Sequence, residues 1–339
     1  MRALQISSGN RLELVAKESV KLAPWEARIS VAISLVCGSD IKNIRSPDSE
    51  KRVPGHEFAG VVSEVSIEAN GFLKIGERVT SFPMMPCHFC ENCENGQFRD
   101  CENKESLGGD KWPGSFATEV IIDARMAVVL PEELSLEQGA MLEHLCCGYR
   151  LALEINEDDF SKESRILIIG DGPIALADLQ MLLNQGFSDI AVVGKHPFRL
   201  KVAEELGASK TFNITSVDEG SVWNFEKIDI CILSAPTEKI LLNISKKLST
   251  GALIIEQTRF LDADLKDHLI ACGFKFRRGF AYHIADFDAV AQLMIRGRLN
   301  TESLITKRIR LDDFGSTYPN NLAKHENIKV AVINDDLLE

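Results

Sequence analysis

The sequence has no apolar run approaching the roughly 18 to 20 residues that a membrane-spanning helix requires. Met1 to Asn10 contain no basic segment followed by an apolar stretch, so no signal peptide is predicted and we expect the protein in the cytoplasm. Cationic residues are also few, because 38 Lys and Arg against 50 Asp and Glu give a formal net charge of −12. That charge repels polyanions, so nucleic acid is not expected as a partner. Because no apolar span is present, a membrane is not expected either. No repeat of roughly 20 to 50 residues is present, which argues against a solenoid.

The residues that are present have the balance of a soluble globular protein, with 45% hydrophobic and 26% charged side chains. At about 150 residues per domain, a chain of 339 residues predicts two domains. Short β-rich runs separated by Gly and Pro predict an irregular β-rich domain in the first third, with strands at 25–36, 58–65, 78–81 and 116–122.

From about residue 164 the pattern changes to alternating strands and helices. Strands are expected at 165–169, 189–193 and 228–233, and helices at 174–185 and 198–206. Such a series of βαβ units predicts a doubly wound parallel sheet covered by helices, so the fold class is α/β with a β-rich domain beside it. A helix at 287–296 and a strand at 328–333 follow, and we expect the end of the chain to return to the first domain.

Four of the nine cysteines lie within one short loop, at Cys87, Cys90, Cys93 and Cys101. In a reduced compartment this crowding indicates metal ligation rather than disulfides. Four thiolates favour a tetrahedral zinc site, and an iron–sulfur cluster is the competing interpretation. Because four cysteine ligands leave no coordination position for a substrate, the predicted role is structural.

A second group of possible ligands is spread along the chain, at Cys37, His56 and Glu143. One thiolate, one imidazole and one carboxylate make the three-ligand set with which a catalytic zinc keeps a fourth position open. Each residue alone has an ordinary alternative, since a single cysteine is most often a small buried apolar side chain. The interpretation therefore depends on the motifs around these residues.

A glycine-rich turn follows the first strand of the second region. The segment Gly170-Asp-Gly172-Pro173-Ile174-Ala175 has the G-x-G-x-x-A pattern between an expected strand and an expected helix. Gly170 permits the tight turn, Gly172 lets a pyrophosphate approach the backbone, and Ala175 allows the helix to pack closely on the strand. The turn predicts a dinucleotide site at the N-terminus of the helix.

These motifs together resemble the zinc-containing medium-chain dehydrogenase/reductase superfamily, whose relatives include alcohol, sorbitol and threonine dehydrogenases. The resemblance rests on family motifs that occur in family order over nearly the whole chain, namely Cys37-Gly38-Ser39-Asp40, Gly55-His56-Glu57, the four-cysteine lobe and the glycine-rich turn. It implies a GroES-like catalytic domain at 1–145 and 285–339, which includes a structural zinc lobe at 83–105. It also implies a Rossmann dinucleotide-binding domain at 146–284.

The resemblance further implies that Cys37, His56 and the polyol-type ligand Glu143 hold a catalytic zinc. Glu57 matches a carboxylate that lies behind the metal or moves onto it, and Asp40 matches the group that orients the ligand histidine. In the implied catalytic machinery, Ser39 accepts the proton of the substrate alcohol, although a helix-capping serine would also fit the position.

The chain departs from the family pattern at two positions. Lys42 stands where many relatives have a histidine that passes the proton to solvent. It could replace that histidine, bind an anionic substrate group, or simply be solvated. His144 follows Glu143 where polyol relatives commonly have proline, which makes it a rival ligand. Cys147 falls at a position that packs near the nicotinamide in the family.

The expected cofactor is NADP(H) rather than NAD(H). In the family frame, Gly194 occupies the position of the acidic residue that selects NAD, and Lys195, His196 and Arg199 follow it. Losing the carboxylate and gaining cations favours a 2′-phosphate. The alternative is that Lys195 and Arg199 are solvated residues at a helix start.

The predicted function is reversible alcohol oxidation or carbonyl reduction by hydride transfer, with two zinc ions per chain. The substrate is expected to be a small polyol or sugar-derived molecule, and a homodimer or homotetramer is expected. A non-catalytic or regulatory member of the same fold is the alternative, motivated by Lys42 and His144.

Overall fold

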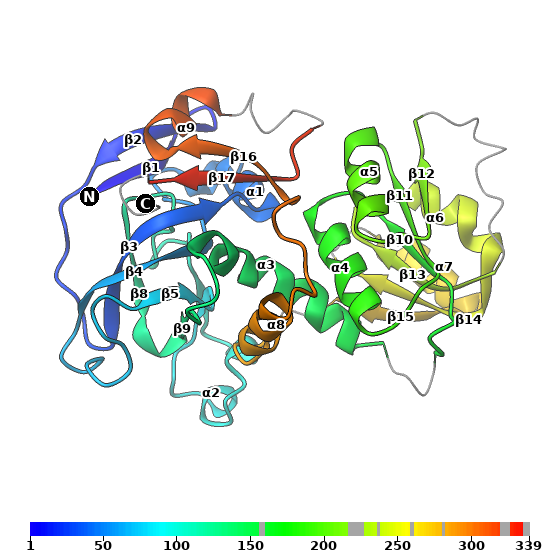
Figure 1. The fold of residues 1–339 in the computed structure, drawn as a ribbon, viewed down its shortest axis with the longest axis horizontal. Helices are drawn as coiled ribbons and strands as arrows, with labels where there is room; N and C mark the ends of the chain where they lie inside the picture. The colour runs from blue at the N-terminus through cyan, green and yellow to red at the C-terminus, as the bar shows by residue number, and fades with distance from the viewer. Residues whose placement is uncertain are drawn as a thin grey trace. The chain divides into compact units, whose positions relative to one another are not determined.

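The computed structural model describes residues 1–155, 160–215, 227–235, 238–257, 261–279, 282–318 and 326–334. The chain divides into two compact units (Figure 1). Unit 1 contains Met1–Glu143 and His283–Glu339, and unit 2 contains His144–Tyr282. The boundary falls inside helix α3 (Leu136–Leu153). Among the described helices, none has the length and apolar character needed to cross a bilayer.

Unit 1 is rich in β-structure. Its strands are β1 (Arg2–Ser7), β2 (Arg11–Ala16), β3 (Glu26–Leu35), β4 (Glu57–Val65), β5 (Arg78–Ser81), β6 (Met84–Met85), β7 (Glu105–Ser106), β8 (Glu119–Asp123), β9 (Ala127–Val129), β16 (Ile305–Arg310) and β17 (Lys329–Ile333). Its helices besides α3 are α1 (Gly38–Ile44), α2 (Glu91–Glu94), α8 (Asp286–Ile295) and α9 (Leu311–Thr317), with 3₁₀ turns η1 (Pro47–Ser49), η2 (Phe98–Asp100) and η3 (Ala124–Met126).

Strand β3 is the centre of the main sheet, whose strand order is β16-β17-β3-β4-β5-β9, with β8 also paired to β3. Because it has partners on both sides, β3 is buried along almost its whole length. Strand β17 pairs antiparallel with β3, so the last described strand lies in the same sheet as the first third of the chain. Backbone pairing of Val36 N–H with Val330 O extends this contact past the end of β3.

One expected strand begins later than predicted. The sequence favoured a strand from Phe116, but β8 begins at Glu119. Phe116 instead donates its N–H to Pro54 O and accepts from Leu4 N–H, and Ala117 forms an isolated bridge with Ala3. The segment before β8 is therefore extended but paired with other parts of the unit.

Unit 2 has the doubly wound architecture that the sequence predicted. Its strands are β10 (Ile166–Ile169), β11 (Ile190–Gly194), β12 (Lys210–Asn213), β13 (Ile228–Leu233), β14 (Leu248–Glu256) and β15 (Lys275–Arg278). Its helices besides α3 are α4 (Pro173–Asn184), α5 (Pro197–Glu205), α6 (Glu238–Ile244) and α7 (Ala263–Ala271), with η4 (Ser245–Lys247).

The strands have the order β12-β11-β10-β13-β14-β15, and all of them are parallel. From β10 the chain adds strands first toward one edge of the sheet, as β11 and β12, and then toward the other edge, as β13, β14 and β15. Every residue of β10 is buried, as expected for a parallel strand covered on both faces. In Figure 1, α4 and α5 lie on one side of the sheet and α6 and α7 on the other. The carboxyl ends of β10 and β13 therefore form the switch point at which such sheets bind dinucleotides.

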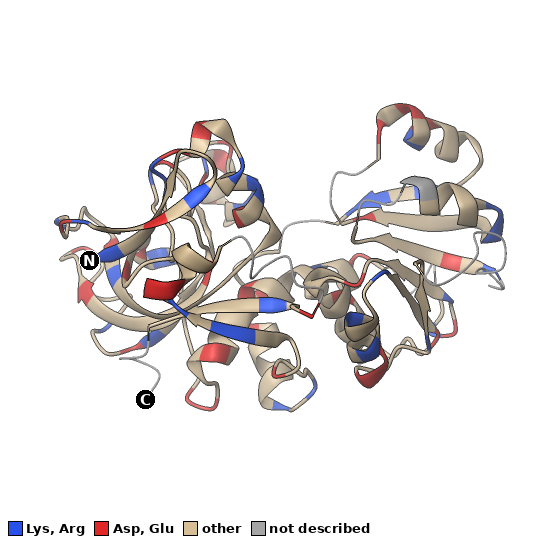
Figure 2. Ribbon diagram, turned by 90° about the horizontal axis from the view of Figure 1, so that it is seen from above, with Lys and Arg blue, Asp and Glu red and all other residues tan. Residues whose placement is uncertain are grey.

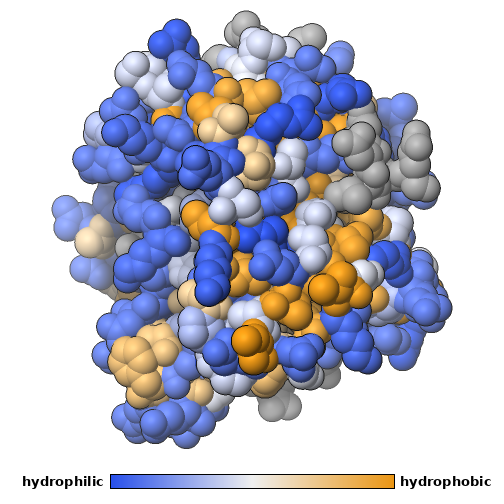
Figure 3. All heavy atoms as spheres, turned by 90° about the vertical axis from the view of Figure 1, so that its left-hand side faces the viewer, coloured by the Kyte–Doolittle hydropathy of each residue, from blue (hydrophilic) through white to orange (hydrophobic). Residues whose placement is uncertain are grey.

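The surface carries both signs of charge. Figure 2 shows acidic and basic residues interspersed along the ribbons of both units. The face of unit 1 in Figure 3 is mostly hydrophilic, with apolar side chains gathered in smaller areas between the polar ones. Acidic and basic residues are thus mixed along both units, although the sum over the chain is −12.

Candidate metal and cofactor sites

The Cys37 and His56 segments are joined by the carboxylate of Asp40. Cys37 is the extended residue that caps α1, and its N–H donates to Asp40 Oδ2 at 2.9 Å. Asp40 Oδ1 accepts from Gly55 N–H at 3.1 Å and lies 3.2 Å from His56 Nδ1. Asp40 is 1% exposed, so this carboxylate is held inside unit 1. A single buried side chain thus fixes both segments and orients the imidazole.

The turn before His56 requires glycine. Gly55 has a φ of +103°, and a Cβ there would lie 2.8 Å from the backbone nitrogen of Phe116. This close approach places His56 directly before β4. Burial acts to lower the pKa of His56, but the Asp40 carboxylate outweighs it and holds that pKa well above its usual value.

The structure brings Cys37, His56 and Glu57 together. One potential ligand atom from each residue lies within 4.8 Å of the others. A thiolate, an imidazole and a carboxylate are the donors that zinc takes in catalytic sites. The donor set therefore fits a zinc ion.

Glu143 lies in α3 with 6% exposure and is not among the residues of that group. It is near the group electrostatically, because its charge is one of those that raise the pKa of Lys329. Its role as third zinc ligand stays a prediction.

Sequence reasoning missed Lys329. Its ammonium donates to Glu57 Oε1 at 2.6 Å and also to Oε2, and both side chains are buried. Burial acts to lower the pKa of Lys329, but the charges of Glu57 and Cys37 raise it above its usual value. The signal available beforehand was one lysine inside the apolar run of the last expected strand.

The other residues predicted around this site are placed as follows. Ser39 and Lys42 are exposed on α1. His144 is 1% exposed, and its Nε2 lies 3.0 Å from Pro173 O, so this nitrogen donates to a backbone carbonyl. Cys147 is half-buried in α3. The contact with Pro173 engages one of the two ring nitrogens of His144, the predicted rival ligand.

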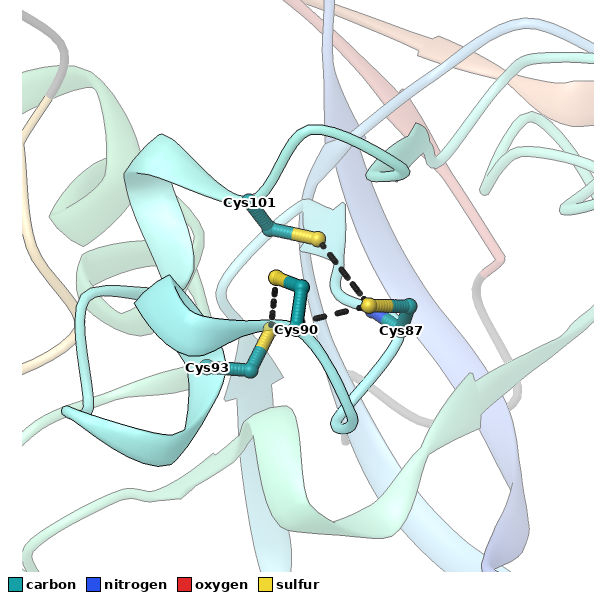
Figure 4. A group of neighbouring side chains, drawn as sticks. All are labelled: Cys87, Cys90, Cys93 and Cys101. Atoms are coloured by element: carbon teal, nitrogen blue, oxygen red, sulfur yellow. Dashed lines mark hydrogen bonds between the residues drawn. The ribbon is translucent and has the colours of Figure 1, made fainter.

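The four-cysteine loop forms a compact group of thiols (Figure 4). The sulfurs of Cys90 and Cys93 are 3.5 Å apart, those of Cys101 and Cys87 3.6 Å, and those of Cys87 and Cys93 3.9 Å. A tetrahedron with zinc–sulfur distances of about 2.3 Å has sulfurs about 3.8 Å apart. The spacing therefore fits a single tetrahedral ion.

The glycine-rich turn has the backbone that a dinucleotide site requires. Gly170 has a φ of +137°, and a Cβ there would lie 3.1 Å from the Ser234 carbonyl carbon. A Cβ on Gly172, which caps α4, would meet nothing within 4 Å, so the backbone is open there. Ala175, in the first turn of α4, is fully buried. This open turn at the start of α4 fits a pyrophosphate, and Pro173 and Ile174 form its first helical residues.

At the end of β11, the predicted residues surround a carboxylate that sequence reasoning did not use. Gly194 is buried, Lys195 is exposed, and His196 caps α5. Asp171, the residue between the two glycines of the turn, accepts hydrogen bonds from the N–H groups of Lys195 and His196. It also forms an ion pair with Arg199 at 3.7 Å.

Comparison with known proteins places this architecture among dehydrogenases. Residues 23–132 match the alcohol dehydrogenase GroES-like domain. L-idonate 5-dehydrogenase of Vitis vinifera is 32% identical over 208 residues, which cover 58% of this chain and 56% of the relative. The matched segment thus spans little more than half the length of that relative.

Two solved structures share the fold over nearly the whole chain. An alcohol dehydrogenase of Escherichia coli CFT073 complexed with NADH has a TM-score of 0.83 at 22% identity and covers 98% of this chain and 99% of its own. A putative zinc-binding dehydrogenase of Sinorhizobium meliloti bound to NADP has a TM-score of 0.82 at 20% identity, with the same coverage. Together with the GroES-like match and the motif order, these likenesses make the chain similar to zinc-type dehydrogenases of the medium-chain dehydrogenase/reductase superfamily.

Proposed function

We propose that the protein is a zinc-dependent oxidoreductase that interconverts an alcohol and a carbonyl compound by hydride transfer with NADP(H). The observation that carries the proposal is the convergence of Cys37, His56 and Glu57 in a chain that also has an open dinucleotide turn. A catalytic zinc and a nicotinamide are the two reagents of that chemistry.

Cys37, His56 and Glu143 would hold the catalytic zinc, with Glu57 behind it or exchanging onto it. Zinc, when bound, supplies a Lewis acid for the substrate oxygen, and the nicotinamide supplies or accepts the hydride. Asp40 keeps the imidazole of His56 oriented through its contact with Nδ1.

Ser39 would take the proton of the substrate alcohol during oxidation and return it during reduction. Its exposed position on α1, two residues after Cys37, leaves the hydroxyl free to meet a substrate. Lys42 lies one helical turn further on and is exposed to solvent, which supports it as the group that exchanges the proton with water or meets an anionic substrate group.

The thiols of Cys87, Cys90, Cys93 and Cys101 would hold a second, structural zinc. Burial raises the pKa of Cys87, but hydrogen bonds from the backbone of Phe89 and Cys90 lower it to about 6. A lowered pKa at Cys87 favours the thiolate that binds a metal, whereas burial and the neighbouring thiols raise the pKa of Cys93 to about 12 when no metal is bound.

For the cofactor, Gly194 offers no carboxylate to a ribose hydroxyl, Lys195 follows it directly, and Arg199 lies in the first turn of α5. Both features support NADP(H), with the turn from Gly170 to Ala175 on the pyrophosphate and Cys147 near the nicotinamide. We take the GroES-like catalytic domain to be residues 1–145 and 285–339, and the dinucleotide-binding domain to be 146–284.

The substrate class is a small polyol or sugar-derived molecule, a choice supported by the carboxylate Glu143 at the third ligand position and by the likeness to a dehydrogenase named for L-idonate. We further propose that the protein assembles as a homodimer or homotetramer and acts in the cytoplasm.

The test is to assay the purified protein with NADPH and with NADH against a panel of ketoses and aldehydes. Oxidation of the cofactor is measured as a decrease in nicotinamide absorbance. Turnover with at least one carbonyl substrate is expected, with NADPH preferred. A protein that binds cofactor but turns over no member of the panel, nor the matching alcohols with NADP⁺, would instead be a regulatory member of the fold.

A further inference from the structure

The loop after β11 is fastened to the glycine-rich turn by one side chain. Asp171 Oδ2 accepts from the N–H of Lys195 at 2.8 Å and from the N–H of His196 at 2.7 Å. The ring Nδ1 of His196 lies 3.0 Å from each carboxylate oxygen, and Arg199 Nη1 lies 3.7 Å from Oδ1. Three of the four residues predicted to recognise a 2′-phosphate therefore contact the same carboxylate.

Asp171 does not serve as the acidic residue that binds the ribose hydroxyls in NAD-dependent domains. It is 6% exposed, and Oδ2 already accepts from two backbone N–H groups. A carboxylate oxygen has about two lone pairs for strong hydrogen bonds. The Asp171 carboxylate thus binds backbone N–H groups of the protein at the end of β11.

The side chain of Asp171 fills the space that a side chain at position 194 would need. A Cβ on Gly194 would lie 2.4 Å from both Cβ and Oδ2 of Asp171, a separation that no real Cβ contact has. In dinucleotide-binding domains, the acidic residue that binds the ribose 2′-hydroxyl lies at this end of the second strand. With Asp171 in place, no side chain can grow from position 194.

We propose that Asp171 is a positioning residue for cofactor selection. It keeps position 194 without a side chain and holds Lys195, His196 and Arg199, at the end of β11 and the start of α5, as a cationic group for the 2′-phosphate of NADP(H). This inference rests on the proposed function, whose cofactor preference it explains.

Asp171 could either favour a 2′-phosphate, by ordering its donors, or disfavour it, by electrostatic repulsion. The balance of charges around Asp171 decides between these two effects. A carboxylate beside the ribose could repel a 2′-phosphate. Here, however, the single negative charge of Asp171 is outnumbered by the two cations Lys195 and Arg199, and its oxygens are covered by N–H groups. The loop as a whole is therefore positive, and the ordering of its donors outweighs the repulsion.

The test measures binding of two cofactor fragments by calorimetry, adenosine 2′,5′-bisphosphate and adenosine 5′-diphosphate, and so needs no turnover. Asp171→Ala should lower affinity for the 2′-phosphorylated fragment about tenfold or more, because the carboxylate that orders the phosphate-binding donors is lost. Affinity for adenosine 5′-diphosphate should change much less.

Gly194→Ala separates position from charge. It leaves Asp171 and all the cations in the chain but displaces the carboxylate sterically, so the same selective loss is expected. The double variant Asp171→Gly/Gly194→Asp, which removes the Cβ of residue 171 as well as its carboxylate, should prefer adenosine 5′-diphosphate. Asp189→Ala is the matched control, since this carboxylate lies at the opposite end of β11, where it binds Arg165.

Thermal melting of each variant establishes that it is folded, and Asp171→Asn replaces Asp171→Ala if the latter is not. Tighter binding of the 2′-phosphorylated fragment by Asp171→Ala would overturn the inference, and so would an equal loss of both fragments. A wild-type protein that prefers adenosine 5′-diphosphate would overturn the NADP(H) preference itself. A wild-type protein that binds neither fragment would contradict the dinucleotide site and with it the proposed function.

Discussion

Lys329, in the last described strand, places its ammonium 2.6 Å from Oε1 of Glu57, 272 residues earlier in the chain. The contact places a buried cation beside the carboxylate of the candidate metal site. Three negative charges, on Cys37, Glu57 and Glu143, raise the pKa of this lysine. The ammonium of Lys329 thus offsets part of the negative charge that gathers around the candidate metal site.

Lys329→Met should destabilise the protein by about 3 to 5 kcal/mol, because it removes the cation that neutralises a buried carboxylate. Chemical denaturation measures the effect. The double variant Lys329→Met/Glu57→Gln should recover part of the loss, since neither charge is then left alone. If the double variant lost the sum of both single effects, the ion pair would contribute no coupling.

Ser39→Ala should lower kcat on the order of a hundredfold, as expected when a group that transfers a proton is removed. Cofactor binding should stay unchanged, because Ser39 lies on α1 of unit 1, away from the dinucleotide turn in the sequence. Asn43→Ala, an exposed residue of the same helix, is the control. Equal rates for Ser39→Ala and wild type would remove Ser39 from the mechanism.

Cys93→Ser should remove one zinc per chain and lower the melting temperature, since folding of the lobe is coupled to the metal. Metal analysis by mass spectrometry reads the first effect. Cys272→Ser should change neither quantity, because that cysteine is exposed and lies outside the four-cysteine group. Full zinc content in Cys93→Ser would argue against the structural site.

Asp178 predicts a pH dependence of stability. This residue of α4 is completely buried, and burial raises its pKa to about 7, although Ser234 Oγ and Gln257 Nε2 donate to it. Because the folded pKa lies above the unfolded value of about 3.9, the contribution to stability is complete below about pH 4 and is lost as the pH rises toward 7.

Asp178→Asn should therefore gain stability relative to wild type by up to about 1.4 kcal/mol per pH unit across that window. Denaturation at several pH values measures the difference, with the exposed Asp267→Asn as control. A constant difference between variant and wild type from pH 4 to 7 would show that Asp178 is not titrating there.

Features that depend on short segments could be predicted from the sequence. The turn at Gly170 and Gly172 lies between a strand and a helix that begin and end within a residue or so of the predicted bounds. The four cysteines are close in the sequence, so one loop brings their sulfurs together.

Contacts between distant segments could not be predicted in this way. Lys329 meets Glu57 only because β17 pairs with β3, a register that no local pattern encodes. The contact of Asp171 with position 194 depends on how closely β10 and β11 place their carboxyl ends. Phe116 shows the same limit, since its extended segment pairs with β1 and Pro54 before β8 begins.

The most direct test of the account is the zinc content of the Cys37→Ser variant compared with wild type, measured on folded protein. Two zinc ions per wild-type chain and one per Cys37→Ser chain are expected, with the remaining ion in the four-cysteine lobe. One zinc ion in both proteins would contradict a catalytic metal at Cys37 and His56.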